Sequence, residues 1–220
     1  NPKQSDCDYP EKGLCGEVVA FKLIIALYEE YGIPKKELED YYELAAIATV
    51  GDVMDLQGEN RILVKEGLRR LKDTENIGLR ELIRANGLED MKITSYHVGF
   101  VLGPCINASG RLDTAARSLA LLNAKDREKA ARLAGDLTAL NQSRKALTEK
   151  GKEEAIQMVE TTSLSQDKVL VIFLPDCHES IAGIIAGRIR EKYHKPSIVL
   201  TRGETGIKGS GRSIEGYSMF

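Results

Sequence analysis

The stretch from Asp126 to about Thr162 constrains the fold most, because it predicts one long helix without a proline. Its apolar side chains recur at helical spacing, and they are Ala130, Leu133, Ala134, Leu137 and Leu140, followed by Leu147, Ala155, Ile156 and Val159. At about 1.5 Å per residue such a helix extends roughly 50 Å, which exceeds the width of a small lobe. We therefore predict a strut that joins two unlike lobes, with a cleft beside it.

Two polar, glycine-rich stretches lie on either side of this helix in the sequence. Gly103 to Arg111 precedes it and Gly209 to Ser213 follows it, and each contains an arginine. We interpret both as turns and expect them to face each other across the cleft.

The bulk composition is that of an ordinary globular protein, with 42% hydrophobic and 29% charged residues among 220. No apolar run approaches the roughly 20 residues that cross a bilayer, and the first residues show no signal sequence, so we expect a cytoplasmic protein without a membrane partner. The four cysteines lack CxxC spacing, which favours reduced thiols. The chain begins without methionine and stops directly after a glycine-rich turn, so we also expect a fragment.

Charge is distributed unevenly although the formal net charge is only −2. Residues 1–60 contain five Lys or Arg against thirteen Asp or Glu, whereas residues 188–213 contain seven against two. An acidic region suits metal ions and a basic region suits phosphates. The alternative is that both are simply solvated surfaces.

The first lobe is predicted to be helical after an extended loop over 1–13. The expected helices are Leu14 to Tyr31, which we interpret as buried; Pro34 to Gly51; Asn60 to Leu71; Gly78 to Ala85; Ser95 to Leu102, capped by Thr94 and containing His97; and Thr114 to Asn123, with Ala115, Leu119 and Leu122 inward.

Asp52 follows the apolar stretch Ala45 to Val50, which looks internal. Burying an unpaired carboxylate is costly, so this side chain needs a partner. A helix cap, a salt bridge and a metal ion all remain open as that partner.

The stretch Gly103 to Arg111 combines glycines and a proline with the amide of Asn107 and the guanidinium of Arg111. Such donors on an irregular loop suit a phosphate oxygen. The alternative is a turn between helices in which Asn107 and Arg111 bond to loop carbonyls.

After residue 163 the pattern predicts a small α/β lobe. Val169 to Leu174 and Pro196 to Thr201 are typical of buried strands, and small residues such as Gly183 and Gly187 let the intervening helix pack closely on the sheet. In the last turn, Ser210, Arg212 and Ser213 could bind phosphate oxygens. The fold class is therefore α/β.

Five segments in order resemble the RecJ family of single-stranded-DNA-specific exonucleases, within the DHH phosphoesterase superfamily. They are Asn1 to Gln4 with Tyr9-Pro10 and Leu14 to Gly16; Ala48 to Leu56 with Glu59 to Arg61; Gly103 to Leu112; His178 to Arg188; and Lys208 to Ser213. The resemblance implies three parts: the C-terminal part of a DHH domain over 1–125, a connecting helix over 126–162, and part of a DHH-associated, nucleic-acid-binding domain over 163–220.

By this resemblance the full-length parent removes nucleotides from the 5′ end of single-stranded DNA with Mn²⁺ or Mg²⁺, in DNA repair and recombination. Asp52 would be a metal ligand, and Asn107 and Arg111 would position phosphate near the metal. The residues that would bind the DNA backbone are His178, Ser210, Arg212 and Ser213. A single-strand-binding protein and a helicase are the implied partners of the parent.

Two departures from the family pattern matter. Cys105 stands where an arginine is common, so one phosphate contact would be absent or supplied from elsewhere. The first aspartate motifs and the Asp-His-His motif would precede Asn1, and a Gly-Gly-His segment would follow Phe220. Because Asp52 alone cannot hold a two-metal centre, we expect these 220 residues to be catalytically inactive by themselves.

Two other functions remain open from the sequence. One is a DHH phosphodiesterase that acts on short oligonucleotides or cyclic dinucleotides. The other is a nucleic-acid-binding relative without catalytic activity.

Overall fold

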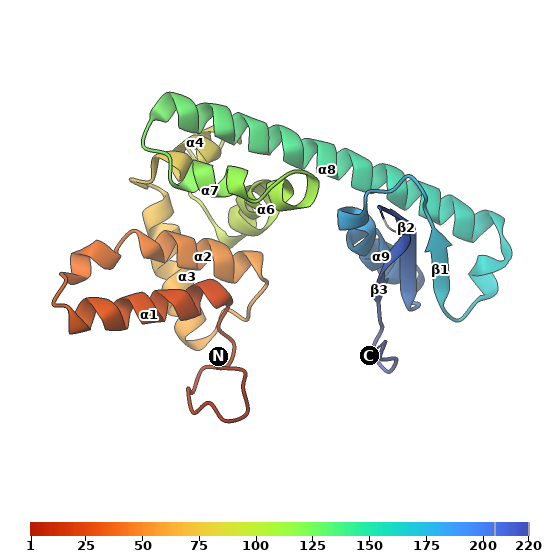
Figure 1. Ribbon diagram of the computed structural model, residues 1–220, viewed down its shortest axis with the longest axis horizontal. Helices are drawn as coiled ribbons and strands as arrows, with labels where there is room; N and C mark the ends of the chain where they lie inside the picture. The colour runs from red at the N-terminus through yellow and green to blue at the C-terminus, as the bar shows by residue number, and fades with distance from the viewer. Residues whose placement is uncertain (205, 220) are drawn as a thin grey trace. The chain divides into compact units, whose positions relative to one another are not determined.

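The structure, a computed structural model, describes residues 1–204 and 206–219. It contains two compact units, Asn1–Leu140 and Asn141–Phe220, and the boundary between them falls within one long helix, α8 (Arg127–Thr161) (Figure 1). The predicted proline-free helix over 126–162 is therefore confirmed to within a residue at each end. The α/β class is also confirmed.

The first unit is helical. After a loop over 1–15, its elements are α1 (Gly16–Glu30), the 3₁₀ turn η1 (Lys35–Leu38), α2 (Tyr41–Gly51), α3 (Gly58–Leu71), α4 (Ile77–Ala85), α5 (Ser95–His97), the π-helical turn η2 (Val98–Leu102), α6 (Gly103–Leu112), α7 (Ala116–Leu122) and the first part of α8.

Two hydrophobic cores hold this unit together. One joins α1 to α2 and α3 around Val18 and Phe21, and the other joins α4, η2, α6, α7 and α8 around Leu82, Leu102 and Leu137. The side chains of α2 and α3 pack so closely that a Cβ atom at Gly67 would lie 2.1 Å from the carbonyl oxygen of Tyr42. This close packing fixes α2, whose C-terminal end carries Asp52.

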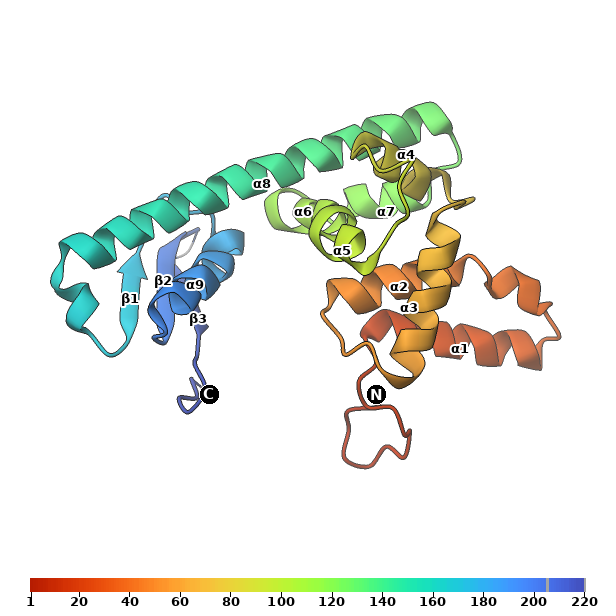
Figure 2. The same ribbon diagram turned by 180° about the vertical axis from the view of Figure 1, so that it is seen from behind.

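The second unit consists of the rest of α8, η3 (Ser163–Gln166), β1 (Leu170–Phe173), α9 (Glu179–Tyr193), β2 (Ser197–Gly203) and β3 (Gly206–Arg212). The strand order is β1-β2-β3, with β1 parallel to β2 and β2 antiparallel to β3. In both ribbon views α9 lies against the sheet (Figures 1 and 2).

One face of this sheet is covered and the other is open. Leu170, Ile172 and Val199 are fully buried against α8 and α9, whereas Val171 and Phe173 are exposed on the opposite face. The predicted strands over 169–174 and 196–201 are confirmed, but the expectation that they are buried is wrong for one face of β1, since a continuous apolar run can form a strand whether or not both faces are covered.

Several sequence predictions for the helices were wrong in detail. The helix at 14–31 is buried on one face only, with Leu23 61% exposed, and the helix expected from Pro34 is interrupted between η1 and α2. In α7, Leu119 is 62% exposed and Leu121 is buried instead. The errors in α1 and α7 share one cause: apolar residues surround both helices, so periodicity alone does not say which face a neighbour covers.

Both glycine-rich stretches were also predicted wrongly as turns. Gly103 to Arg111 belongs to helix α6, and Gly209 to Arg212 belongs to strand β3. A Cβ at Gly103 would lie 2.8 Å from the carbonyl oxygen of Val98 in the preceding π turn. Glycine is therefore used here for close packing within regular structure.

Within the described residues, no helix combines the length and the apolar character needed to cross a membrane. All four cysteines lie among the described residues, and none of them forms a disulfide.

Candidate catalytic and nucleic-acid-binding sites

Asp52 lies at the C-terminal end of α2, where the backbone forms a tight cap. The N–H of Val53 bonds to the carbonyl of Val50 at 3.1 Å, and the N–H of Met54 bonds to the carbonyl of Thr49 at 3.1 Å. These are the two hydrogen bonds of a Schellman cap, which normally has glycine at the position that Val53 occupies. The sequence prediction of a helix-end position for Asp52 is confirmed, but its side chain is exposed and not internal.

Val53 is strained in this cap. Its φ is 56°, in the left-handed region, and its side chain is 87% exposed, so burial does not compensate for the strain. A β-branched residue in this conformation costs roughly 1–2 kcal/mol. Backbone strain of this kind is concentrated at functional sites, and here it is adjacent to Asp52.

Asp52 and Asn107 line the same cavity in the first unit. This cavity has a volume of about 300 Å³, and its lining consists of Glu17, Leu44, Ile47, Ala48, Gly51, Asp52, Gly103, Ile106, Asn107 and Leu122. Three separate elements supply its polar side chains, namely the first turn of α1, the end of α2, and α6. The structure thus brings together two residues that the sequence analysis assigned to one site.

Arg111 does not line this cavity, although it is exposed and lies four residues after Asn107 on the same helix. Residues four apart share a helix face, so α6 presents the amide and the guanidinium side by side. Helix α6 is tied to α7 by Ser109, whose Oγ lies 2.7 Å from Oγ of Ser118, and Ser118 in turn donates to the carbonyl of Ile106 at 2.7 Å. The irregular loop expected here is a regular helix, and the convergence of Asn107 and Arg111 on a phosphate stays a prediction.

Cys105 lies on the opposite face of α6. Its side chain is fully buried, and its Sγ lies 3.7 Å from Oδ1 of Asn86. The thiol therefore contributes to the core and offers nothing to the cavity that contains Asp52.

Glu17 is the cavity residue that the sequence analysis missed. Its Oε2 atom is buried and has no hydrogen-bond partner among the described residues, and burial raises the pKa of the Glu17 carboxyl to about 7. The only signal in the sequence was an acidic residue directly after Gly16, at the start of an otherwise apolar helix.

The oxygen atoms of this cavity are of the type that binds a hard divalent cation, but there are too few of them to hold one. Carboxylate and amide oxygens are the ligands that Mg²⁺ and similar ions prefer, and an orphaned carboxylate oxygen is available for such an ion. Across residues 1–204 and 206–219, however, no group of three or more His, Cys, Asp or Glu side chains could hold a metal ion. The described residues therefore do not form a metal site by themselves, and the role of Asp52 as a metal ligand stays a prediction.

In the second unit, strand β3 places its polar side chains toward α9. Ser210 is paired with Val199, and Arg212 with Ser197, both of which are buried residues of β2. Directly paired residues of antiparallel strands point to the same face, so Ser210 and Arg212 lie on the face that α9 covers. Arg212 donates to Oγ of Ser210 at 3.2 Å, which holds the two side chains together.

The close approach of α9 depends on Gly183. A Cβ atom there would lie 2.7 Å from Oγ of Ser210 and 2.8 Å from Nη2 of Arg212. The prediction that small residues let this helix pack closely on the sheet is confirmed at Gly183 but wrong at Gly187, where a Cβ atom would meet nothing within 4 Å. Nearby, Lys208 forms an ion pair with Glu179 at 2.7 Å, a partner that the sequence analysis did not anticipate.

His178 is the N-cap of α9, and its Nδ1 accepts a hydrogen bond from the backbone N–H of Ser180 at 3.3 Å. The imidazole is exposed at the same end of the helix as Glu179. Ser213 follows the end of β3 and is partly buried. His178, Ser210 and Arg212 thus lie around the first turns of α9, whereas Asp52, Asn107 and Arg111 belong to the first unit. That the two groups face each other stays a prediction.

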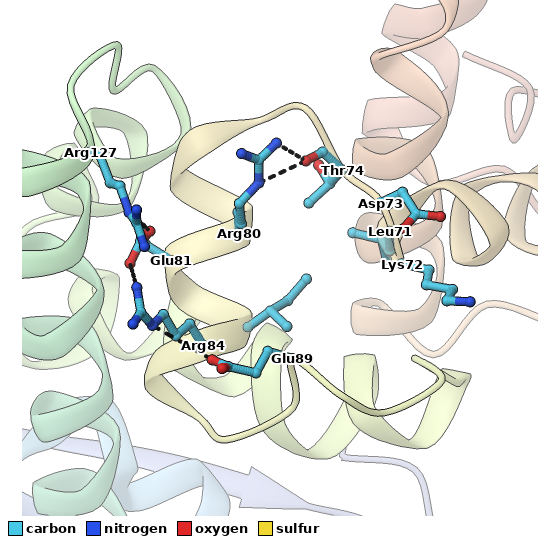
Figure 3. A pocket seen from close by; sticks show the side chains of 10 residues that line it. Leu71, Lys72, Asp73, Thr74, Arg80, Glu81, Arg84, Glu89 and Arg127 are labelled. Carbon is cyan, nitrogen blue, oxygen red and sulfur yellow. Dashed lines mark hydrogen bonds and ion pairs between the residues drawn. The ribbon is translucent and has the colours of Figure 1, made fainter.

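A second hollow in the first unit, of about 580 Å³, is lined by several arginines whose side chains already have partners within the unit (Figure 3). Arg127 lies 2.9 Å from the buried carboxylate of Glu81, and Arg84 pairs with Glu81 and Glu89 at 4.0 and 3.6 Å. Arg80 donates to the carbonyl of Thr74. We interpret this hollow as the structural junction of α4 with α8.

Comparison with solved structures identifies the class of protein. The fold is that of exonucleases of single-stranded DNA: a RecJ structure in complex with Mg²⁺ from Thermus thermophilus matches 96% of this chain with a TM-score of 0.85 and 36% identity, over 32% of its own length. A structure of exonuclease RecJ bound to manganese matches 99% of the chain with a TM-score of 0.83 and 35% identity, over 53% of its length.

Sequence comparison leads to the family. The chain belongs to the RecJ family of single-stranded-DNA-specific exonucleases: it is homologous to them along its whole length, with 38% identity to that of Dickeya dadantii and 39% to that of Bacillus subtilis. It spans 40% of the Dickeya protein and 27% of the Bacillus protein. No protein-family model matches the chain.

Proposed function

We propose that the chain is part of a metal-dependent exonuclease that shortens single-stranded DNA from its 5′ end. The observation that carries the proposal is the homology to RecJ exonucleases over the whole chain, at 38% and 39% identity to two of them. The cavity that Asp52 shares with Asn107 supports it, because a carboxylate and an amide then line one volume, and Arg111 lies four residues after Asn107 on the same helix.

Each group has a distinct chemical role in this proposal. Asp52 would help to hold Mn²⁺ or Mg²⁺, and a bound ion of this kind supplies an activated water and stabilises charge on the phosphate. Asn107 and Arg111 would orient the scissile phosphate by hydrogen bonding to its oxygens. In the second unit His178, Ser210, Arg212 and Ser213 would bind the DNA backbone, which positions the strand without reading its sequence.

We also propose that the full-length parent degrades DNA from the 5′ end and acts in DNA repair and recombination. Its proposed partners are a single-strand-binding protein and a helicase. We further propose that the 220 residues alone are inactive, since Asp52 and Glu17 offer too few ligands for two metal ions.

The test of activity uses the complete open reading frame that contains this sequence. With Mn²⁺ and a labelled, 5′-phosphorylated single strand, we expect progressive shortening that stops when a chelator is added, and no shortening by the 220-residue chain. An inert complete protein would refute the exonuclease function. Cleavage restricted to dinucleotides would favour a phosphodiesterase of short substrates.

The backbone-binding role of the second unit is tested on the 220-residue chain. Gly183→Ala places a Cβ atom against Ser210 and Arg212, whereas a Cβ at Gly187 on the same helix meets nothing within 4 Å. We expect Gly183→Ala and Arg212→Ala to weaken binding of a fluorescent single strand several-fold, and Gly187→Ala to leave it unchanged.

Fluorescence anisotropy at several salt concentrations measures this effect. Loss of one phosphate contact should reduce the salt slope by about 0.7 for a single strand. Equal affinities for Gly183→Ala and Gly187→Ala would show that this face of the unit does not contact DNA.

A further inference from the structure

Two aromatic side chains of the first unit are stacked on each other in a position that is open to solvent. The ring centroids of Tyr96 and Phe100 are 4.9 Å apart, and the angle between the ring planes is 29°. Tyr96 is nevertheless 63% exposed and Phe100 is 65% exposed. Single exposed apolar residues are common on protein surfaces, whereas an exposed aromatic stack offers a platform on which a further flat ring can stack.

The backbone holds this aromatic pair in place. The N–H of Thr94 donates to Nδ1 of His97 at 3.2 Å, which fixes the first turn of α5. The ring of His97 packs edge-on against that of Tyr96, with centroids 5.9 Å apart. Phe100 lies in the π turn η2, and such turns are frequent at functional sites. The pair is therefore preorganised, which reduces the entropy that is lost when a ligand binds.

A groove lies next to this pair along the chain. It runs between α3 and the segment that leads into α5 (Figure 2), and its volume is about 720 Å³. Ser95 lines the groove and directly precedes Tyr96 in the sequence. The apolar side chain of Ile62 also lines it and is 68% exposed.

Positive charge predominates in this groove. Lys65, Arg69 and Lys92 line it together with a single carboxylate. That carboxylate belongs to Glu66, which already forms ion pairs with Arg69 and Arg70, each at 2.7 Å. Among residues 1–204 and 206–219, neither Lys65 nor Lys92 forms an ion pair, and both side chains are exposed. Free ammonium groups beside exposed aromatic rings suit a polyanion that carries flat bases.

We propose that Ile62, Lys65, Lys92, Tyr96 and Phe100 form a surface, the Tyr96 surface, that binds single-stranded DNA. Bases stack on Tyr96 and Phe100, and the two lysines contact phosphates. Binding of this kind is independent of sequence, because every base has a π face. This inference rests on the proposed function for the identity of the strand as DNA, and it concerns residues to which neither the sequence motifs nor the resemblance assigned a role.

The experiment compares binding of the 220-residue chain to fluorescent oligothymidine and to an abasic strand of the same length. The abasic strand has the same phosphates but no bases, so the comparison separates stacking from charge. Tyr96→Ala and Phe100→Ala each remove one ring. Tyr31→Ala is the matched control, because Tyr31 is 75% exposed and lies at the end of α1. Circular dichroism of each variant verifies that helix content is unchanged.

We expect Tyr96→Ala and Phe100→Ala each to weaken binding of oligothymidine about fivefold or more, and to leave binding of the abasic strand within about twofold of its original value. Tyr31→Ala should change neither affinity. Replacing Lys65 and Lys92 together with glutamine should reduce the salt slope by about 1.4 on either strand, since each phosphate contact contributes about 0.7.

The inference is overturned if the unchanged chain binds both strands equally, or if Tyr96→Ala binds oligothymidine as tightly as Tyr31→Ala does. In the complete protein, Tyr96→Ala should raise KM for a long single strand. An unchanged KM would also overturn the inference, because it would show that another part of the parent covers the ring. Failure of the proposed function is distinguishable: the complete protein with its natural residues would then not shorten the strand, whatever the affinities of the 220-residue chain.

Discussion

Replacing Glu17 with glutamine should make the chain more stable at neutral and alkaline pH. Burial raises the pKa of this carboxyl from 4.5 to about 7 in the folded state. The folded chain therefore binds the proton more tightly than the unfolded chain does, and the stability of the folded state falls as pH rises from about 4.5 to about 7. Above that range the penalty is complete.

The magnitude follows from the size of the shift. For a fully shielded carboxyl, raising the pKa from 4.5 to about 7 corresponds to about 3.4 kcal/mol. Glu17 is only partly buried and lies in the first turn of α1, where backbone amides favour a negative charge. After solvent screening, we expect a penalty of about 1–2 kcal/mol.

The assay is urea denaturation in the presence of a chelator, followed by circular dichroism at pH 5 and pH 8. The free energy of unfolding of Glu17→Gln, relative to that of the natural chain, should increase by about 1–2 kcal/mol between these two pH values. Glu30→Gln on the same helix should show no such change. A difference between Glu17→Gln and the natural chain that is independent of pH would refute the claim that an unpaired, buried carboxylate destabilises this cavity.

Three further predictions concern stability and are measured in the same way at neutral pH. Gly67→Ala should destabilise the first unit by about 3 kcal/mol or more, because its Cβ would lie 2.1 Å from a carbonyl oxygen of α2, whereas Gly135→Ala, with nothing within 4 Å, should stabilise it by up to about 1 kcal/mol. Arg127→Ala should cost about 1–2 kcal/mol, since it removes the 2.9 Å partner of Glu81, a carboxylate that is only 4% exposed; no loss would mean that Arg84 alone is a sufficient partner. Val53→Gly should stabilise by about 1 kcal/mol by relieving the left-handed strain, and a loss of stability would show that the valine side chain makes a compensating contact.

The regular elements of this protein could be predicted from the sequence because their signals are local. The absence of proline and the spacing of apolar residues gave the 35-residue helix α8, and two β-branched runs gave β1 and β2. The assignment of Asp52 to a helix end also needed only its immediate neighbours. Family resemblance supplied its chemical role, which no local pattern contains.

The two glycine-rich stretches show where local reasoning failed. In β3, Gly209 and Gly211 look like turn residues, yet a Cβ at either position would lie within 3 Å of Leu200 or Met219 on the open side of the sheet. The glycines make room for side chains from other parts of the second unit. This reason for a glycine can be recognised only when the side chains that pack against it are known.

Which residues line the cavity of Asp52 is determined by the tertiary structure. Glu17, Asp52 and Asn107 come from three helical elements that are each more than 30 residues apart in the sequence, and long-range packing of apolar faces brings them to one volume of about 300 Å³. Sequence patterns record the faces that helices bury but not the partners that cover them, because hydrophobic burial has no directional preference. The sequence by itself therefore determined the helices and strands, and only the folded chain determined that Glu17 lines the same cavity as Asp52.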